Sequence, residues 1–143
     1  GAKHEYDFDI FRTTAELVKH TCLTYIDLSN LEYTIREAHV NRFMDYNVSL
    51  QKLQDAAQIV ESILKRRDSV FNDLVKTYEE TRLPKGFSTS EKKFFWQQDR
   101  ARHFAFRRPD MSFLIYDEQL LDLEGYLKNL RSYIEFFKTN SMN

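Results

Sequence analysis

The chain has 143 residues, of which 42% are hydrophobic and 15% aromatic, and its formal net charge is -1. A chain of this length buries about 70% of its unfolded surface on folding, so the composition predicts one folded globular domain rather than a disordered chain. The near-neutral charge disfavours nucleic acids and anionic membranes as partners, and the lack of a long apolar run in the sequence excludes a membrane-spanning helix.

The first predicted element is a helix that begins near Asp9, whose carboxylate suits an N-cap, and ends at about Tyr46. We expect residues 1–8 to form a disordered lead-in left by excision from a longer protein, and residues 9–143 to form a single helical bundle domain. Residues 27–30 are polar, and we expect the helix to continue through them with a kink. Its apolar positions recur at helical spacing, at Ile10, Phe11, Leu17, Val18, Cys22, Tyr25, Leu28, Leu31, Ile35 and Ala38.

A turn is predicted at residues 45–49, where Asp, Asn and Ser side chains compete for backbone hydrogen bonds and cap the following helix. That second helix runs from about Leu50 to Arg82. Additional apolar residues widen its apolar row, which predicts contacts with two partner helices. We expect the basic triplet Lys65, Arg66 and Arg67 to lie on a solvated face. The row comprises Leu50, Leu53, Ala57, Val60, Leu64, Phe71, Leu74 and Tyr78, widened by Ala56, Ile59, Ile63 and Val70.

Pro84 and Gly86 end the second helix, because proline disfavours a helical conformation for the residue before it and glycine permits a left-handed exit. A third, shorter helix is predicted over residues 88–108, because a capping-box pattern begins it and Pro109 stops it.

A fourth helix is predicted to begin at the cap Asp110, and within it we expect Gly125 to mark a close helix crossing. The sequence therefore predicts an all-α fold, an elongated up-and-down bundle of three long helices and one shorter helix. A coiled-coil oligomer is the structural alternative, and a homodimer is left open. The apolar row of the fourth helix is Phe113, Tyr116, Leu120, Leu123, Leu127, Leu130, Ile134 and Phe137.

The sequence shows no pattern typical of a catalytic or metal site. His20, His39 and His103 are each preceded three residues earlier by leucine or arginine, so the Glu-x-x-His pattern of bundle metal centres does not occur. Asp99 and His103 share one helix face but supply too few ligands for a metal. Cys22 is the single cysteine, and we expect it to be a small buried apolar group. We therefore expect no enzyme activity and no cofactor.

The candidate binding residues lie in the segment 81–110, which carries eight basic and three acidic residues, a net charge of +5. A helical wheel places Trp96, Arg100, His103 and Arg107 on one side of the third helix, opposite its small apolar residues. Tryptophan, arginine and histidine on an outward face are typical of a protein-docking hot spot. The alternative is internal pairing of the basic residues, with Arg102 and Arg108 bound to Asp117, Glu118 or Asp122.

The same segment resembles a known family. The run from Thr81 to Gly86, followed by Gln98-Asp99, His103-Phe104-Ala105, Arg107-Arg108-Pro109-Asp110 and Tyr116, is similar to the helical region after the catalytic barrel in some bacterial family 20 glycoside hydrolases. These are the β-N-acetylhexosaminidase-like enzymes, and the likeness is clearest over residues 60–139. The family uses an adjacent Asp-Glu pair, but the pair Asp117-Glu118 lies in a helical stretch with no barrel strand, so the catalytic role is not carried over to it.

The resemblance implies a non-catalytic C-terminal accessory domain of a bacterial carbohydrate-degrading enzyme, exported to the periplasm or cell surface. Its partner would be the remainder of the parent chain. Two other functions stay open from the residues alone. One is a free-standing helical interaction or oligomerisation module, and the other is a helical enzyme or ligand carrier.

Overall fold

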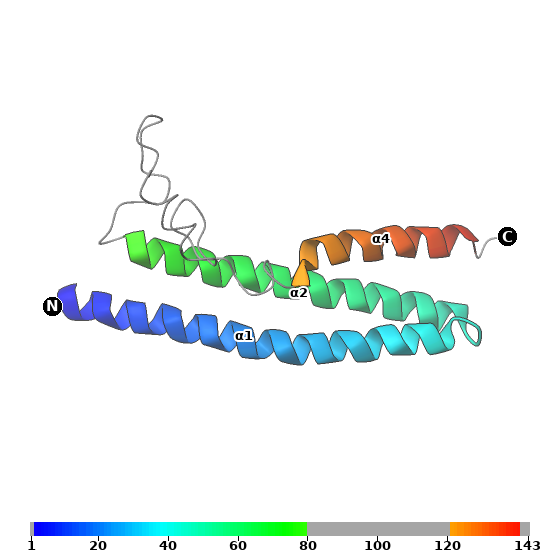
Figure 1. The fold of residues 1–143 in the computed structure, drawn as a ribbon, viewed down its shortest axis with the longest axis horizontal. Coiled ribbons are helices and arrows are strands. Elements are labelled where there is room, and N and C mark those ends of the chain that lie inside the picture. The colour runs from blue at the N-terminus through cyan, green and yellow to red at the C-terminus, as the bar shows by residue number, and fades with distance from the viewer. Residues whose placement is uncertain (1, 80–120, 141–143) are drawn as a thin grey trace, which may run out of the picture. The chain divides into compact units, whose positions relative to one another are not determined.

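The computed structural model describes residues 2–79 and 121–140, which form three α-helices (Figure 1). Helix α1 spans Ala2–Asn41, α2 spans Tyr46–Glu79 and α4 spans Leu123–Asn140. No residue in these described ranges lies in a β-strand, which confirms the all-α class. The predicted third helix, over residues 88–108, lies outside the described residues, so the count of four helices stays a prediction.

The chain divides into two compact units, and α1 and α2 contribute to both. The first unit combines Gly1–Val18 with Ser69–Leu121, and the second combines Lys19–Asp68 with Asp122–Asn143. The single domain expected over residues 9–143 stays a prediction.

In the second unit, α2 contacts α1 and α4, and both neighbours run antiparallel to it. The Ser49 hydroxyl donates to the Ala38 carbonyl at 2.7 Å, and the Arg66 side chain reaches back to His20 on α1. Further contacts join α2 to α4, where Arg67 pairs with Glu124, Arg131 pairs with Glu61, and Tyr46 stacks on Phe137. The two partner helices predicted for the second helix are therefore confirmed.

The core of the second unit draws on all three helices. Ala56, Val60 and Ile63 are fully buried on α2, which explains why its apolar row is wider than a two-stranded seam requires. The other buried apolar residues of this unit are Leu31 and Ala38 on α1, Leu53 and Ala57 on α2, and Leu123, Leu127, Leu130 and Ile134 on α4.

Helix α1 begins at Ala2, so the expected disordered lead-in over residues 1–8 and the predicted helix start at Asp9 are wrong. The Asp9 carboxylate accepts a hydrogen bond from Arg12 Nε at 3.4 Å instead of capping the backbone. Acidic residues near the start, including Glu5, favour the helix because its N-terminus carries partial positive charge. The helix continues through residues 27–30 as predicted, but it ends at Asn41 rather than near Tyr46.

Asp45 starts α2, as the predicted turn implied. Its Oδ1 accepts from the Val48 amide at 3.1 Å and its carbonyl accepts from the Ser49 amide at 3.0 Å, which is the geometry of an N-cap. Because the cap lies at Asp45, α2 begins at Tyr46, four residues before the predicted start at Leu50.

Helix α4 begins at Leu123, and the unbroken fourth helix predicted from Asp110 is wrong. Asp122 has a φ of 42°, in the left-handed region that ends a run of helical residues. Its Oδ1 accepts from the Gly125 amide at 3.2 Å and its carbonyl accepts from the Tyr126 amide at 2.9 Å, so Asp122 caps α4. A Cβ at Gly125 would clash with the Asp122 carboxylate. Gly125 therefore makes room for the cap and does not mark a helix crossing.

Candidate interaction surface

The side of α1 that packs inward is rich in polar residues. In the second unit it presents His20 and Thr24 beside Leu31 and Ala38, all of them buried. Among the described side chains of α1 in the first unit, Thr13 is buried. The Thr24 hydroxyl donates to the His20 carbonyl at 2.8 Å, which satisfies that hydroxyl inside its own helix. An amphipathic helix normally buries its apolar side, so α1 is reversed in this respect.

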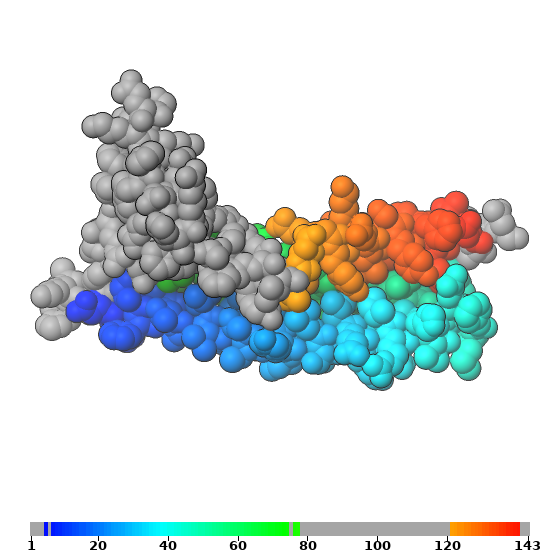
Figure 2. Space-filling model, in the orientation of Figure 1, coloured from blue at the N-terminus to red at the C-terminus, as the bar shows by residue number. Residues whose placement is uncertain are grey.

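The opposite side of α1 is apolar and exposed. In the second unit Tyr33 is 62% exposed and Ile26 is 57% exposed, and Phe43 in the turn after the helix reaches 85%. Figure 2 shows side chains of this half of α1, coloured light blue to cyan, at the molecular surface. Exposed apolar side chains gathered on one face of a helix are typical of an interaction site. We define the α1 outer face as Cys22, Tyr25, Ile26, Tyr33, Val40, Phe43 and Met44.

The apolar row predicted for the first helix included residues from both of these faces. Leu31 and Ala38 are buried as predicted, but Phe11, Val18 and Tyr25 are exposed. Cys22 is also exposed, so its expected burial is wrong. Nine residues separate Cys22 from Leu31, and a turn of about 100° per residue places them on opposite sides of the helix.

A polar network centred on Arg66 holds the inner side of α1 against α2. Arg66 Nε donates to His20 Nδ1 at 3.1 Å, and Arg66 Nη2 lies 2.8 Å from Asp27 Oδ2 and 3.4 Å from Thr24 Oγ1. Buried polar groups are costly without such partners, so this network fixes which side of α1 faces α2. The apolar side is thereby kept outside.

Arg67 makes the corresponding contact with α4. Its side chain is only 7% exposed, and its Nη2 lies 2.9 Å from Asp68 Oδ1 and 2.8 Å from Glu124 Oε1. The solvated triplet predicted at residues 65–67 is therefore wrong for Arg66 and Arg67, and only Lys65 is exposed. Successive helical residues point about 100° apart, so Arg66 reaches α1 while Arg67 reaches α4.

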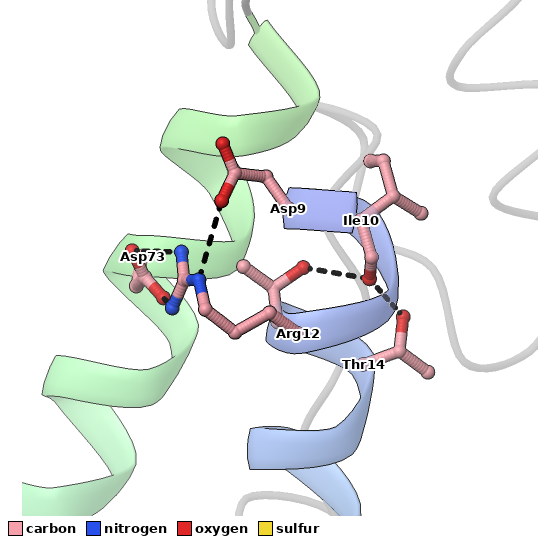
Figure 3. Close-up of polar contacts among 6 residues, drawn as sticks. Asp9, Ile10, Arg12, Thr14 and Asp73 are labelled. Atoms are coloured by element: carbon pink, nitrogen blue, oxygen red, sulfur yellow. Dashed lines mark hydrogen bonds and ion pairs between the residues drawn. The ribbon is translucent and has the colours of Figure 1, made fainter. Parts of the chain in front are cut away.

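In the first unit, Arg12 joins α1 to α2 through a two-pronged ion pair (Figure 3). Arg12 Nη1 lies 2.7 Å from Asp73 Oδ2, and Nη2 lies 3.3 Å from Asp73 Oδ1. The hydrogen bonds that Arg12 donates to Asp73 lower the pKa of this carboxyl group, and the hydrogen bonds that Asp73 and Asp9 accept raise the pKa of Arg12. Both side chains of the pair are substantially exposed, so water and salt weaken its contribution to stability.

Replacing Arg12 by glutamine is expected to raise the pKa of Asp73 toward its ordinary value, because the side-chain hydrogen bonds that favour the carboxylate are lost. A depressed native pKa stabilises the fold above the unfolded-state pKa of aspartate, and this contribution disappears as the pH falls through the native pKa. Arg12→Gln should therefore lose slightly less stability on acidification than the wild type does. Carboxyl NMR titration measures the pKa directly, and Arg131→Gln, remote in sequence, is the control that should leave Asp73 unchanged.

Among the described residues, no group of three or more His, Cys, Asp and Glu side chains is placed to hold a metal ion. None of the described helices has a stretch long and apolar enough to cross a bilayer. An open depression of about 420 Å³ lies between α2 and α4, and its Ser132 hydroxyl donates to the Lys128 carbonyl at 3.1 Å. The depression is lined by Leu64, Glu124, Leu127, Lys128, Arg131 and Ser132.

The predicted docking residues Trp96, Arg100, His103 and Arg107 lie outside the described residues, as does the pair Asp117-Glu118. Arg102 and Arg108 were expected to pair with Asp117, Glu118 or Asp122. Of these residues the structure describes Asp122, which caps α4. The α1 outer face was not predicted from the sequence, although Ile26, Tyr33 and Val40 recur there every seven residues. No protein-family model, curated protein or solved structure matches the chain.

Proposed function

We propose that the chain is a helical protein-interaction module that binds its partner through the α1 outer face. The observation that carries this proposal is the reversal of α1, whose polar side is packed while its apolar side is exposed. Burial of a side chain the size of Ile26 or Val40 is worth about 1.5–3 kcal/mol. A partner that covers the outer face recovers this free energy, which the isolated chain forgoes.

The chemistry of the outer face suits docking. Its aromatic and aliphatic residues alternate with charged ones, because Arg36 lies between Tyr33 and Val40 at helical spacing and forms an ion pair with Glu32 at 2.7 Å. Protein–protein interfaces usually combine apolar contacts with such polar and charged groups. Tyr33, at the middle of the exposed stretch, is of a residue type enriched among interface hot spots.

The accessory-domain function implied by the family resemblance is a narrower form of the same proposal. In that form the partner is the remainder of a bacterial carbohydrate-degrading enzyme, and the complex lies in the periplasm or at the cell surface. The chain itself would carry no catalytic activity. The α1 outer face would supply a docking surface in addition to Trp96, Arg100, His103 and Arg107.

Site-specific photo-cross-linking tests the interaction function. A photoreactive phenylalanine analogue at Tyr33 is expected to give a discrete cross-linked species in the cells that produce the protein, because this side chain lies in the outer face. The same analogue at the exposed Gln58 of α2 is the matched control and should give none. Adding Ile26→Lys should abolish the species while circular dichroism stays unchanged. Equal labelling from positions 33 and 58 would contradict the proposal.

A further inference from the structure

We propose that the partner on the α1 outer face is a second copy of this chain, with the two α1 helices antiparallel and a two-fold axis beside Tyr33. The inference rests on the proposed function, because it names the occupant of the same surface. It draws on the arrangement of apolar residues along the face and on the charges of Glu32 and Arg36.

Five of the seven residues of the outer face are arranged symmetrically about Tyr33, whereas Tyr25 and Phe43 have no counterpart in the face. Ile26 and Val40 lie seven residues before and after it, and Cys22 and Met44 lie eleven residues before and after it. A two-fold interface uses the same patch on both subunits, so that if one residue contacts a second, the second contacts the first. With the axis at Tyr33, Ile26 meets Val40 of the second copy, and Cys22 lies at the level of Met44, in the turn after α1. The apolar levels at Tyr33 and at Ile26 alternate with a polar level, where Ser29 and Asn30 oppose Glu37 and Arg36.

The spacing also selects this register over its neighbour. Seven residues correspond to nearly two helical turns, so Ile26, Tyr33 and Val40 lie along one line of α1. An axis moved to residues 29–30 would still oppose Ile26 and Tyr33, but it would place Val40 against the charged Lys19. Burying a charged group against an aliphatic side chain is costly. The axis at Tyr33 avoids this mismatch.

The charges of Glu32 and Arg36 favour the antiparallel direction. Glu32 and Arg36 lie one residue before and three residues after Tyr33, and both side chains are exposed. In the antiparallel pair, Glu32 of one copy lies within about two residues, or about 3 Å along the axis, of Arg36 of the other. In a parallel pair, the two-fold axis would place Glu32 and Arg36 of one copy on the opposite flank of the seam from those of the other, so these residues would not meet. Opposite charges that meet across an interface favour the orientation that brings them together.

Disulfide cross-linking distinguishes the two directions, and Cys22 is the natural probe. In the antiparallel pair the two Cys22 residues are 22 positions apart along the axis, about 33 Å, which is far beyond disulfide reach. In a parallel pair they would be adjacent. Mild oxidation of the wild-type chain is therefore expected to leave it without an interchain disulfide, whereas Cys22→Ser with Tyr33→Cys should form a covalent dimer. Cys22→Ser with Gln58→Cys is the matched control and should stay monomeric.

Sedimentation measurements test the same interface without cross-linking. The wild type is expected to show a concentration-dependent monomer–dimer equilibrium, and Ile26→Lys with Val40→Lys should weaken dimerisation at least about tenfold, with helix content retained. Glu32→Arg alone should weaken it as well. The exchange Glu32→Arg with Arg36→Glu should restore it, because the antiparallel arrangement again pairs opposite charges.

The outcomes of these experiments distinguish a failure of this inference from a failure of the proposed function. A covalent dimer through Cys22, or failure of the charge exchange to restore dimerisation, overturns the antiparallel arrangement. A chain that stays monomeric while position 33 cross-links to a different protein overturns the second copy as partner and leaves the interaction function standing. A monomeric chain without any cross-link from position 33 overturns both.

Discussion

Replacing Ile63 by alanine is expected to lower the free energy of unfolding by about 2–5 kcal/mol, the range for deleting a buried Ile or Leu side chain. Ile63 is fully buried on α2 in the second unit, beside the equally buried Val60. The truncation removes apolar contacts and leaves a cavity that a closely packed interior fills only in part. Urea unfolding followed by circular dichroism measures the change, with the slope of the transition checked for two-state behaviour.

Ile26→Ala is the matched control, because it makes the same truncation on the α1 outer face. Ile26 is exposed, so this variant should change the free energy of unfolding by no more than about 0.5 kcal/mol when the chain is monomeric. If Ile26→Ala lowers the free energy of unfolding as much as Ile63→Ala does, Ile26 is packed in the monomer. That result would contradict the reversed orientation of α1.

The apolar rows of α2 and of the C-terminal helix were predictable, because each buries one continuous stripe. Leu123, Leu127, Leu130 and Ile134 are buried at the predicted positions. The 3.6-residue spacing of an apolar stripe can be read from the sequence without knowing where the helix begins or ends. The boundary at Asp122 was missed for the same reason, because the alternation of side chains continues across a residue whose backbone leaves the helical region.

The faces of α1 could not be separated from spacing alone, since apolar residues occur on both sides of it. What decides between the sides is the partner of each polar residue, and Arg66 supplies that partner for His20 and Asp27 from 46 and 39 residues away in sequence. A pattern within one helix carries no information on such a contact. The recurrence of Thr13, His20 and Thr24 on one side of the helix was the local signal that this side needs polar partners.

Two substitutions of Arg67 are expected to distinguish how much its aliphatic stem and its charge each contribute to the free energy of unfolding. The side chain is 7% exposed, so Arg67→Ala should lower the free energy of unfolding by about 2–4 kcal/mol through lost packing between α2 and α4. Arg67→Met keeps most of the apolar volume and should change it by less than about 1.5 kcal/mol. Lys65→Ala, at the exposed neighbouring position, is the control, with an expected change within about 0.5 kcal/mol.

The small effect of methionine follows from where the two carboxylates lie. Asp68 and Glu124 are largely exposed, so water solvates them when the guanidinium is removed, and no buried carboxylate of this pair is left behind. The free energy needed to desolvate Arg67 offsets most of the attraction it gains, which is why a buried ion pair can be replaced by an apolar side chain at little cost. If Arg67→Met loses as much stability as Arg67→Ala in urea unfolding, the charge rather than the stem of Arg67 holds α4 on α2.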